Sequence, residues 1–226
     1  MPLVMLISCK NIKKNITFYL ILMLGIELIL MVTFLSLLLL PFFFSFELML
    51  TLISLSVSQW GSKLYKIRST FYLFLFTLCG SVFFLTSIII LLLITGSNNC
   101  SWDLSLKVNQ EIPMTLPFTL ALGIKLPIFP FHIWLPEVHS ESDSSGSLIL
   151  AGILLKLGNY GLIRFTLTLF PIGSCYWSLF IFLLATFGSI LGSPNSLTIV
   201  DIKQIIAYSS ITHMNLAIAD LYSLTV

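Results

Sequence analysis

The sequence predicts an all-α membrane protein, a polytopic bundle of about seven transmembrane helices with one discontinuous helix. Of its 226 residues 58% are apolar and 9% are charged, whereas soluble domains carry about 25% charged residues. The mean hydropathy is +1.06, and 19 phenylalanines are more than one core of this size can hide from water. The apolar residues also gather into segments of about 20, the length that crosses a bilayer as a helix.

The apolar segments follow one another along the chain with short polar connections. Uninterrupted apolar stretches predict helices over 17–40, 42–60, 71–95, 147–170 and 176–191. The segment 113–135 is interrupted by prolines, and 197–224 carries Asp201, Lys203, His213 and Asp220, so their ends are less sharply defined. Residues 1–16 are expected to form an extramembrane N-terminal segment, and residues 17–226 a single membrane domain.

Charge and cysteine content exclude two classes of site. The net charge of +2 is spread over the loops, without the block of Lys and Arg that binds nucleic acid. The four cysteines, Cys9, Cys79, Cys100 and Cys175, stand far apart in the sequence, without the close pairs that zinc or iron–sulfur ligation needs. We therefore expect no nucleic-acid partner, no metal centre and no disulfide framework.

Four ionisable residues, Glu27, Glu47, Lys125 and Lys156, lie inside apolar segments. Each costs about 2.5–3.5 kcal/mol at mid-bilayer on insertion scales. A single one could pair with another or extend its charged end to the membrane surface. Four in one chain favour a functional reading, in which protons or other ions move past them.

Lys125 has the most informative surroundings, because Pro127 and Pro130 follow it closely. A proline removes a backbone donor and disfavours helical geometry in the residue before it, so a helix should end near Lys125 or Leu126. The helix dipole would stabilise the ammonium there while burial favours the neutral amine, and these opposed effects suit proton exchange. Broken helices often form intramembrane ion sites. The alternative is a kinked helix whose lysine reaches the surface.

Lys156 and His213 are further candidates for passing protons. Lys156 precedes Gly158, Asn159 and Gly161, which weaken the helix in mid-span, although such glycines more often serve close helix packing. His213 lies about three helical turns beyond Lys203. A histidine titrates near neutral pH and can relay protons, although a membrane histidine is about as often a packing residue.

Four sequence strings together resemble one known family. These are KLPIFPFHIWLP at 125–136, GSLILAGILLKLGNYGLIR at 146–164, FELML at 46–50 with WG at 60–61, and DIKQIIAYSSITHM at 201–214. They strongly resemble the subunit 4 family of mitochondrial complex I, the NADH:ubiquinone oxidoreductase. The likeness runs from about residue 40 to residue 216.

The resemblance implies an antiporter-like, proton-translocating subunit of the membrane arm, multi-pass in the mitochondrial inner membrane. As part of an H+-translocating NADH:ubiquinone reductase, it would have no redox site and no cofactor of its own; FMN, iron–sulfur clusters and ubiquinone lie in other subunits. By position, Glu47 resembles the family's glutamate of the fifth helix, Lys125 the lysine of the broken seventh, Lys156 the lysine of the eighth and His213 the histidine of the tenth. The implied mechanism is that the Glu47–Lys125 pair sets the proton affinity of Lys125. Protons then pass through Lys156, with a lesser role for His213.

Departures from the family concern two side chains and the length. Leu52 and Asp143 stand where the family usually has proline. The matched part corresponds to the fourth to tenth of about fourteen helices. We therefore expect a separately encoded chain to supply the C-terminal helices, beside other membrane-arm subunits and lipids.

Two alternatives to this function stay open, a subunit of a related cation/proton antiporter complex and a structural membrane piece without transport. The string at 131–136 favours complex I over the first alternative. The presence of Glu47, Lys125 and Lys156 together argues against the second.

Overall fold

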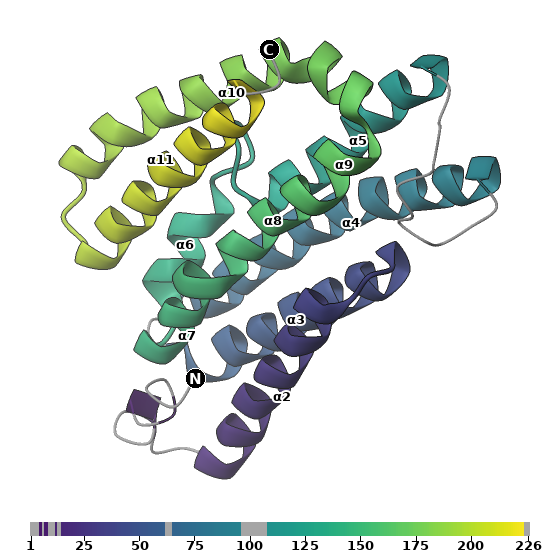
Figure 1. Ribbon diagram of the computed structural model, residues 1–226. Coiled ribbons are helices and arrows are strands. Elements are labelled where there is room, and N and C mark those ends of the chain that lie inside the picture. The colour runs from purple at the N-terminus through teal and green to yellow at the C-terminus, as the bar shows by residue number, and fades with distance from the viewer. Residues whose placement is uncertain are drawn as a thin grey trace.

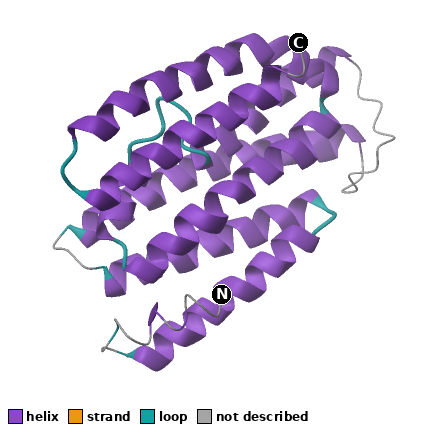
Figure 2. Ribbon diagram, turned by 60° about the vertical axis from the view of Figure 1, so that its left-hand side comes forward, coloured by secondary structure: helices purple, strands orange, loops and turns teal. Residues whose placement is uncertain are grey.

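The computed structural model describes Met5, Ile7, Ser8, Ile12 and residues 15–61, 65–95 and 108–223. Most of the predicted extramembrane segment 1–16, together with Cys9 and Cys100, therefore lies outside the described residues. Within the described ranges the chain is helical and forms no β-strand, as Figure 2 shows. The all-α prediction is confirmed.

The helices follow the chain in the order shown in Figure 1. Their bounds are α2 Ile16–Leu35, α3 Leu39–Trp60, α4 Lys66–Thr95, α5 Val108–Lys125, α6 Trp134–Glu141, α7 Ser144–Ile149, α8 Leu155–Gly161, α9 Leu167–Leu169, α10 Pro171–Thr198 and α11 Ile202–Ser223. Two π-helical segments, Leu150–Leu154 and Leu162–Thr166, join α7, α8 and α9 into one continuous helix. This composite helix corresponds to the predicted span 147–170.

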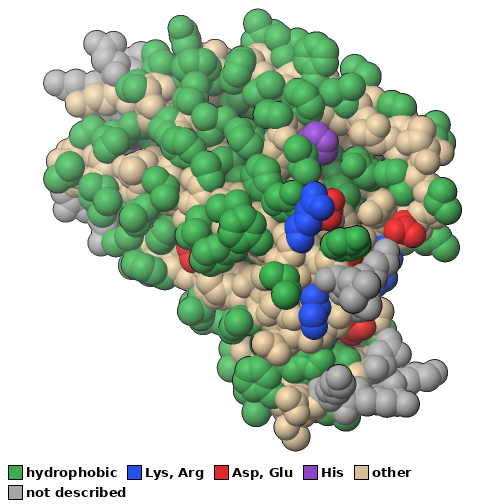
Figure 3. All heavy atoms as spheres, turned by 180° about the vertical axis from the view of Figure 1, so that it is seen from behind, with side chains coloured by type: hydrophobic (Ala, Val, Ile, Leu, Met, Phe, Trp, Pro, Cys, Tyr) green, Lys and Arg blue, Asp and Glu red, His purple; other side chains and the backbone are tan. Residues whose placement is uncertain are grey.

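Five helices of the described ranges are long and apolar enough to cross a membrane: α2, α3, α4, the composite helix Ser144–Leu169 and α10. Large apolar side chains on their outer faces are exposed, for example Leu28 at 68% on α2 and Leu93 at 80% on α4. Hydrophobic side chains are also spread over the whole face in Figure 3. Such surfaces are stable in contact with lipid, so the chain is a multi-pass membrane protein. The predicted count of seven spans stays a prediction.

Several predicted helix boundaries were wrong, and at two of them a proline lies in the first turn of the observed helix. The first helix ends at Leu35 rather than residue 40, because Pro41 lacks an N–H and fits the first turn of a new helix, α3, which begins at Leu39. Helix α10 is longer than predicted and begins at Pro171, a favoured first position. It also continues through Pro194 to Thr198, and α11 begins at Ile202 instead of 197.

The helices form a bundle in which neighbours along the chain are mostly neighbours in space. Helices α2, α3, α4 and α5 pack in succession, and α5 then contacts α10, which pairs with α11. Figure 1 shows α2 and α3 at one side and α10 and α11 at the other. Buried aromatic rings fill the centre, with ring centroids 4.7 Å apart for Phe42 and Phe165 and 4.8 Å apart for Phe84 and Phe118. These rings lie around the candidate site.

Candidate functional site

The predicted helix break occurs at Lys125, the last residue of α5. After it the backbone folds back, with Leu126 N donating to Leu122 O (2.9 Å) and Ile128 N to Gly123 O (3.0 Å). A Cβ on Gly123 would lie 2.8 Å from Ile128 Cδ1, so a larger residue there would require the Ile128 side chain to move. The chain becomes helical again at Trp134, whose indole donates to Ile124 O (3.2 Å) across the break.

The break presents the Lys125 ammonium to Glu47 of α3. The Lys125 Nζ and Glu47 Oε1 atoms are 2.5 Å apart, and their side chains are 1% and 21% exposed. The ammonium also lies 4.0 Å from the ring centre of Phe46 and 5.6 Å from that of Phe84. A carboxylate and two aromatic faces thus replace the water that a buried cation loses. This burial contradicts the alternative in which Lys125 reaches the membrane surface.

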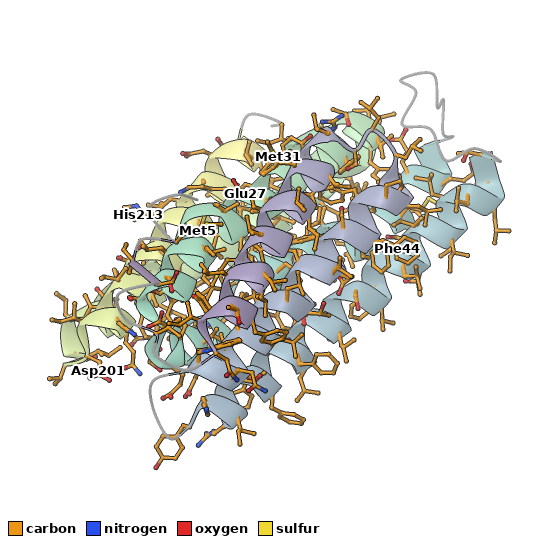
Figure 4. The ribbon with its side chains drawn as sticks, turned by 90° about the horizontal axis from the view of Figure 1, so that it is seen from below. Met5, Glu27, Met31, Phe44, Asp201 and His213 are labelled. Carbon is orange, nitrogen blue, oxygen red and sulfur yellow. The ribbon has the colours of Figure 1, made fainter. Side chains whose placement is uncertain are left out.

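Lys156 and His213 lie on exposed positions of α8 and α11. Within the described ranges neither makes an ion pair or a side-chain hydrogen bond, and neither contacts the Lys125–Glu47 pair. Figure 4 shows His213 at the edge of the bundle that is opposite to Phe44. Glu27, the fourth intramembrane charge, is half-buried on α2. The structure therefore brings together two of the predicted site residues and leaves Lys156 and His213 on an open face.

Helix α8 nevertheless packs directly on the break. A Cβ on Gly158 would lie 2.6 Å from Leu126 Cγ, so the glycine permits the close approach. The next residue, Asn159, points its Nδ2 at Met214 Sδ of α11 at 3.6 Å. Residues close in sequence to Lys156 and His213 therefore bring α8 into contact with the break and with α11.

Three polar features of the fold were not predicted from the sequence. Glu111 of α5, only 4% exposed, accepts hydrogen bonds from the backbone nitrogens of Ile172 (3.2 Å) and Gly173 (3.4 Å) at the start of α10. Asn215 of α11, 0% exposed, donates to Pro127 O in the break. The third feature lies between α6 and α11 and consists of the buried His139 and the bond of Lys203 to Ser142 O.

His139 lies beyond the predicted membrane span, 3% exposed. Burial, with a smaller contribution from the positive charge of Lys203, lowers the pKa of His139 to about 4. Lys203 Nζ in turn donates to Ser142 O (2.7 Å). The start of α11 is thereby fastened to the end of α6.

Asp143, one of the departures from the family pattern, has a structural role. Its Oδ2 accepts a hydrogen bond from Ser145 Oγ (2.6 Å), and that hydroxyl is 2.5 Å from Tyr19 Oη. This chain of bonds connects α2 to the start of the composite helix.

No group of three or more His, Cys, Asp or Glu residues in the described ranges could hold a metal ion. Cys79 and Cys175 are exposed.

Comparison with known proteins gives a consistent assignment. The sequence family described as NADH:quinone oxidoreductase/Mrp antiporter, TM, matches residues 36–226. NADH-ubiquinone oxidoreductase chain 4 of Chondrus crispus is 40% identical over 98% of this chain and 45% of that protein. The Metridium senile protein of the same name is 40% identical over 100% and 46%. The chain thus spans about half the length of the curated relatives it matches.

Solved structures agree in fold. A chain of respiratory complex I from Thermus thermophilus with bound NADH superposes with a TM-score of 0.82 and 28% identity, over 89% of this chain and 44% of that one. A chain of an archaeal membrane-bound sulfane sulfur reductase gives a TM-score of 0.87 at 20% identity, over 97% and 48%. The second likeness concerns the fold alone.

Proposed function

The chain belongs to the NADH:quinone oxidoreductase/Mrp antiporter membrane family, and we propose that it relays protons as an antiporter-like subunit of an NADH:ubiquinone oxidoreductase membrane arm. The observation that carries the proposal is the contact of the buried Lys125 with the half-buried Glu47 at the helix break. Its place would be the mitochondrial inner membrane, among other membrane-arm subunits. Redox chemistry, with FMN, iron–sulfur clusters and ubiquinone, would take place in those other subunits.

The pair supplies a way to load and release a proton. While Glu47 is charged and in contact, its carboxylate stabilises the Lys125 ammonium. When the carboxylate is protonated or moves away, the buried ammonium loses its countercharge, and desolvation then favours the neutral amine and proton release. Because the two side chains are in contact, a charge change near Glu47 alters how strongly Lys125 holds its proton.

Lys156 would receive the proton that Lys125 releases, and His213 would have a lesser relay role. The contact between Gly158 and Leu126 supports this order, because it places the helix of Lys156 against the break. Both residues lie on an exposed face, where further protein or water can reach them. The separately encoded chain that would supply further helices stays a prediction.

A cation/proton antiporter complex is the second candidate, since the family description includes Mrp antiporters. The 40% identity to two chain 4 proteins of NADH-ubiquinone oxidoreductase favours the first candidate.

The relay is tested in the intact, purified complex reconstituted into vesicles. Lys125→Ala should abolish most NADH-driven proton pumping, because it removes the cation that pairs with Glu47 in the described part of the chain. The matched control is Lys66→Ala, which removes a partly exposed lysine whose Nζ donates to Gln59 O, away from the Lys125–Glu47 pair. Near-normal pumping by a fully assembled Lys125→Ala complex would refute the relay.

A further inference from the structure

An amide side chain lies against the helix break with its orientation fixed. Asn215 of α11 is 0% exposed. Its Nδ2 donates to Ile211 O at 2.9 Å and points at Pro127 O at 3.5 Å. Both neighbours are carbonyl oxygens, so the nitrogen must face them and the amide oxygen must face the other way.

The Asn215 amide oxygen has no hydrogen-bond donor in the described part of the chain. The neighbours explain why. Pro127 has no backbone N–H, and Gly188 of α10 has no side chain. A Cβ at Gly188 would lie 2.9 Å from Asn215 Oδ1, so a larger residue there would displace the amide. The packing thus accommodates Asn215 closely without supplying the donor that its oxygen needs.

A second unpaired amide oxygen borders the same break. Asn159 Oδ1 on α8 is buried and, in the ranges that the structure describes, also without a donor. Its nitrogen points at Met214 Sδ, the residue before Asn215. Asn159 also follows Gly158, which contacts Leu126. The two oxygens therefore come from the two helices that pack on residues 126 and 127.

We propose that Asn215, together with Asn159, binds buried water at the helix break, with at least one water molecule donating to Asn215 Oδ1. Buried polar atoms without a protein partner are commonly satisfied by ordered water. Water fits better than a cation, because the ionisable group at the break, Lys125, is positive. The bound water would fasten the break to α8 and α11. The site goes beyond the proposed relay and does not depend on it.

The test is a map of the assembled complex, with the full chain present, at a resolution that shows ordered water. Density within hydrogen-bond distance of Asn215 Oδ1, unaccounted for by protein, is expected in the wild type. Asn215→Leu has a similar size but no acceptor and should lose that density. The matched control Asn195→Leu, at an exposed position of α10, should keep it.

Three results would overturn the site. These are no density beside Asn215 Oδ1 in a map that shows other buried waters, a protein donor or a coordinated cation at that place, or unchanged density in Asn215→Leu. If the Asn215→Leu complex does not assemble, the presence or absence of water density in the wild-type map decides whether the site exists. Because pumping is not part of the readout, the outcome is separate from that of the relay.

Discussion

Glu47→Gln tests the electrostatic basis of the site, because it keeps the shape of the side chain and removes its charge. Lys125 is 1% exposed and would stay buried beside Phe46 without its countercharge. Removing one partner of a buried ion pair costs about 3–5 kcal/mol. Because Glu47 is 21% exposed, some water reaches it, and the lower end, about 3 kcal/mol, is the expected loss.

The double variant Glu47→Gln/Lys125→Gln separates charge from packing. Without either charge, the two amides can bond to each other, so the double variant should be more stable than the sum of the single losses by about 2 kcal/mol. The assay is the thermal denaturation of the purified complex, run for the wild type, both single variants and the double variant. Proton pumping should stay low in all three variants. Strictly additive losses of stability would refute the coupling between the two side chains.

Three further predictions concern the surrounding structure. The pKa of His139 is lowered to about 4 from 6.5, so between these pH values the unfolded state binds more protons than the folded state. The free energy of unfolding should therefore fall as the pH drops from 6.5 towards 4, by at most about 3 kcal/mol. His139→Gln should flatten this dependence in thermal denaturation across pH, and an unchanged slope would contradict the assignment. Gly158→Val would push α8 away from Leu126 and should destabilise the complex by about 1–3 kcal/mol, whereas Gly152→Val, which meets open space, serves as the control in the same assay. Glu111→Leu should lower the free energy of unfolding by about 1–3 kcal/mol, because it leaves the N–H groups at the start of α10 unpaired. Glu111→Gln keeps an acceptor and should lose much less stability. Equal losses in the two variants would show that hydrogen bonding is not the cause.

The helix break could be predicted because proline acts locally. Pro127 lacks a backbone N–H and restricts Leu126, and α5 ends two residues before it, at Lys125. The same local reasoning misplaced the end of the first helix, where the apolar run continues to residue 40 but Pro41 requires a new helix start. Strong apolar character therefore located the membrane segments. Proline marked some helix ends but not others, since α5 continues through Pro113 and Pro117 and α10 through Pro194.

Long-range contacts were beyond local reasoning. Glu47 and Lys125 are 78 residues apart, and their pairing was expected only through the family resemblance. Glu111 reaches the start of α10 across 61 residues, and no spacing rule links the two. The exposure of Lys156 depends on which faces of α8 other helices cover, and that is a property of the assembled bundle.

Each of the two π-helical segments lets the composite helix hold one extra residue without turning the residues beyond it. A π turn accommodates one more residue than an α turn, and successive residues in an α-helix are about 100° apart around the axis. Deleting one residue from Leu150–Leu154 would therefore convert that turn to α-helix and leave Lys156 facing nearly the same way. Deleting one from Leu162–Thr166 would leave Lys156 in place and the end of the helix facing as before. The direction in which Lys156 faces thus tolerates the loss of one residue from the turn before it, whereas in an unbroken α-helix the same loss would turn Lys156 by about 100°.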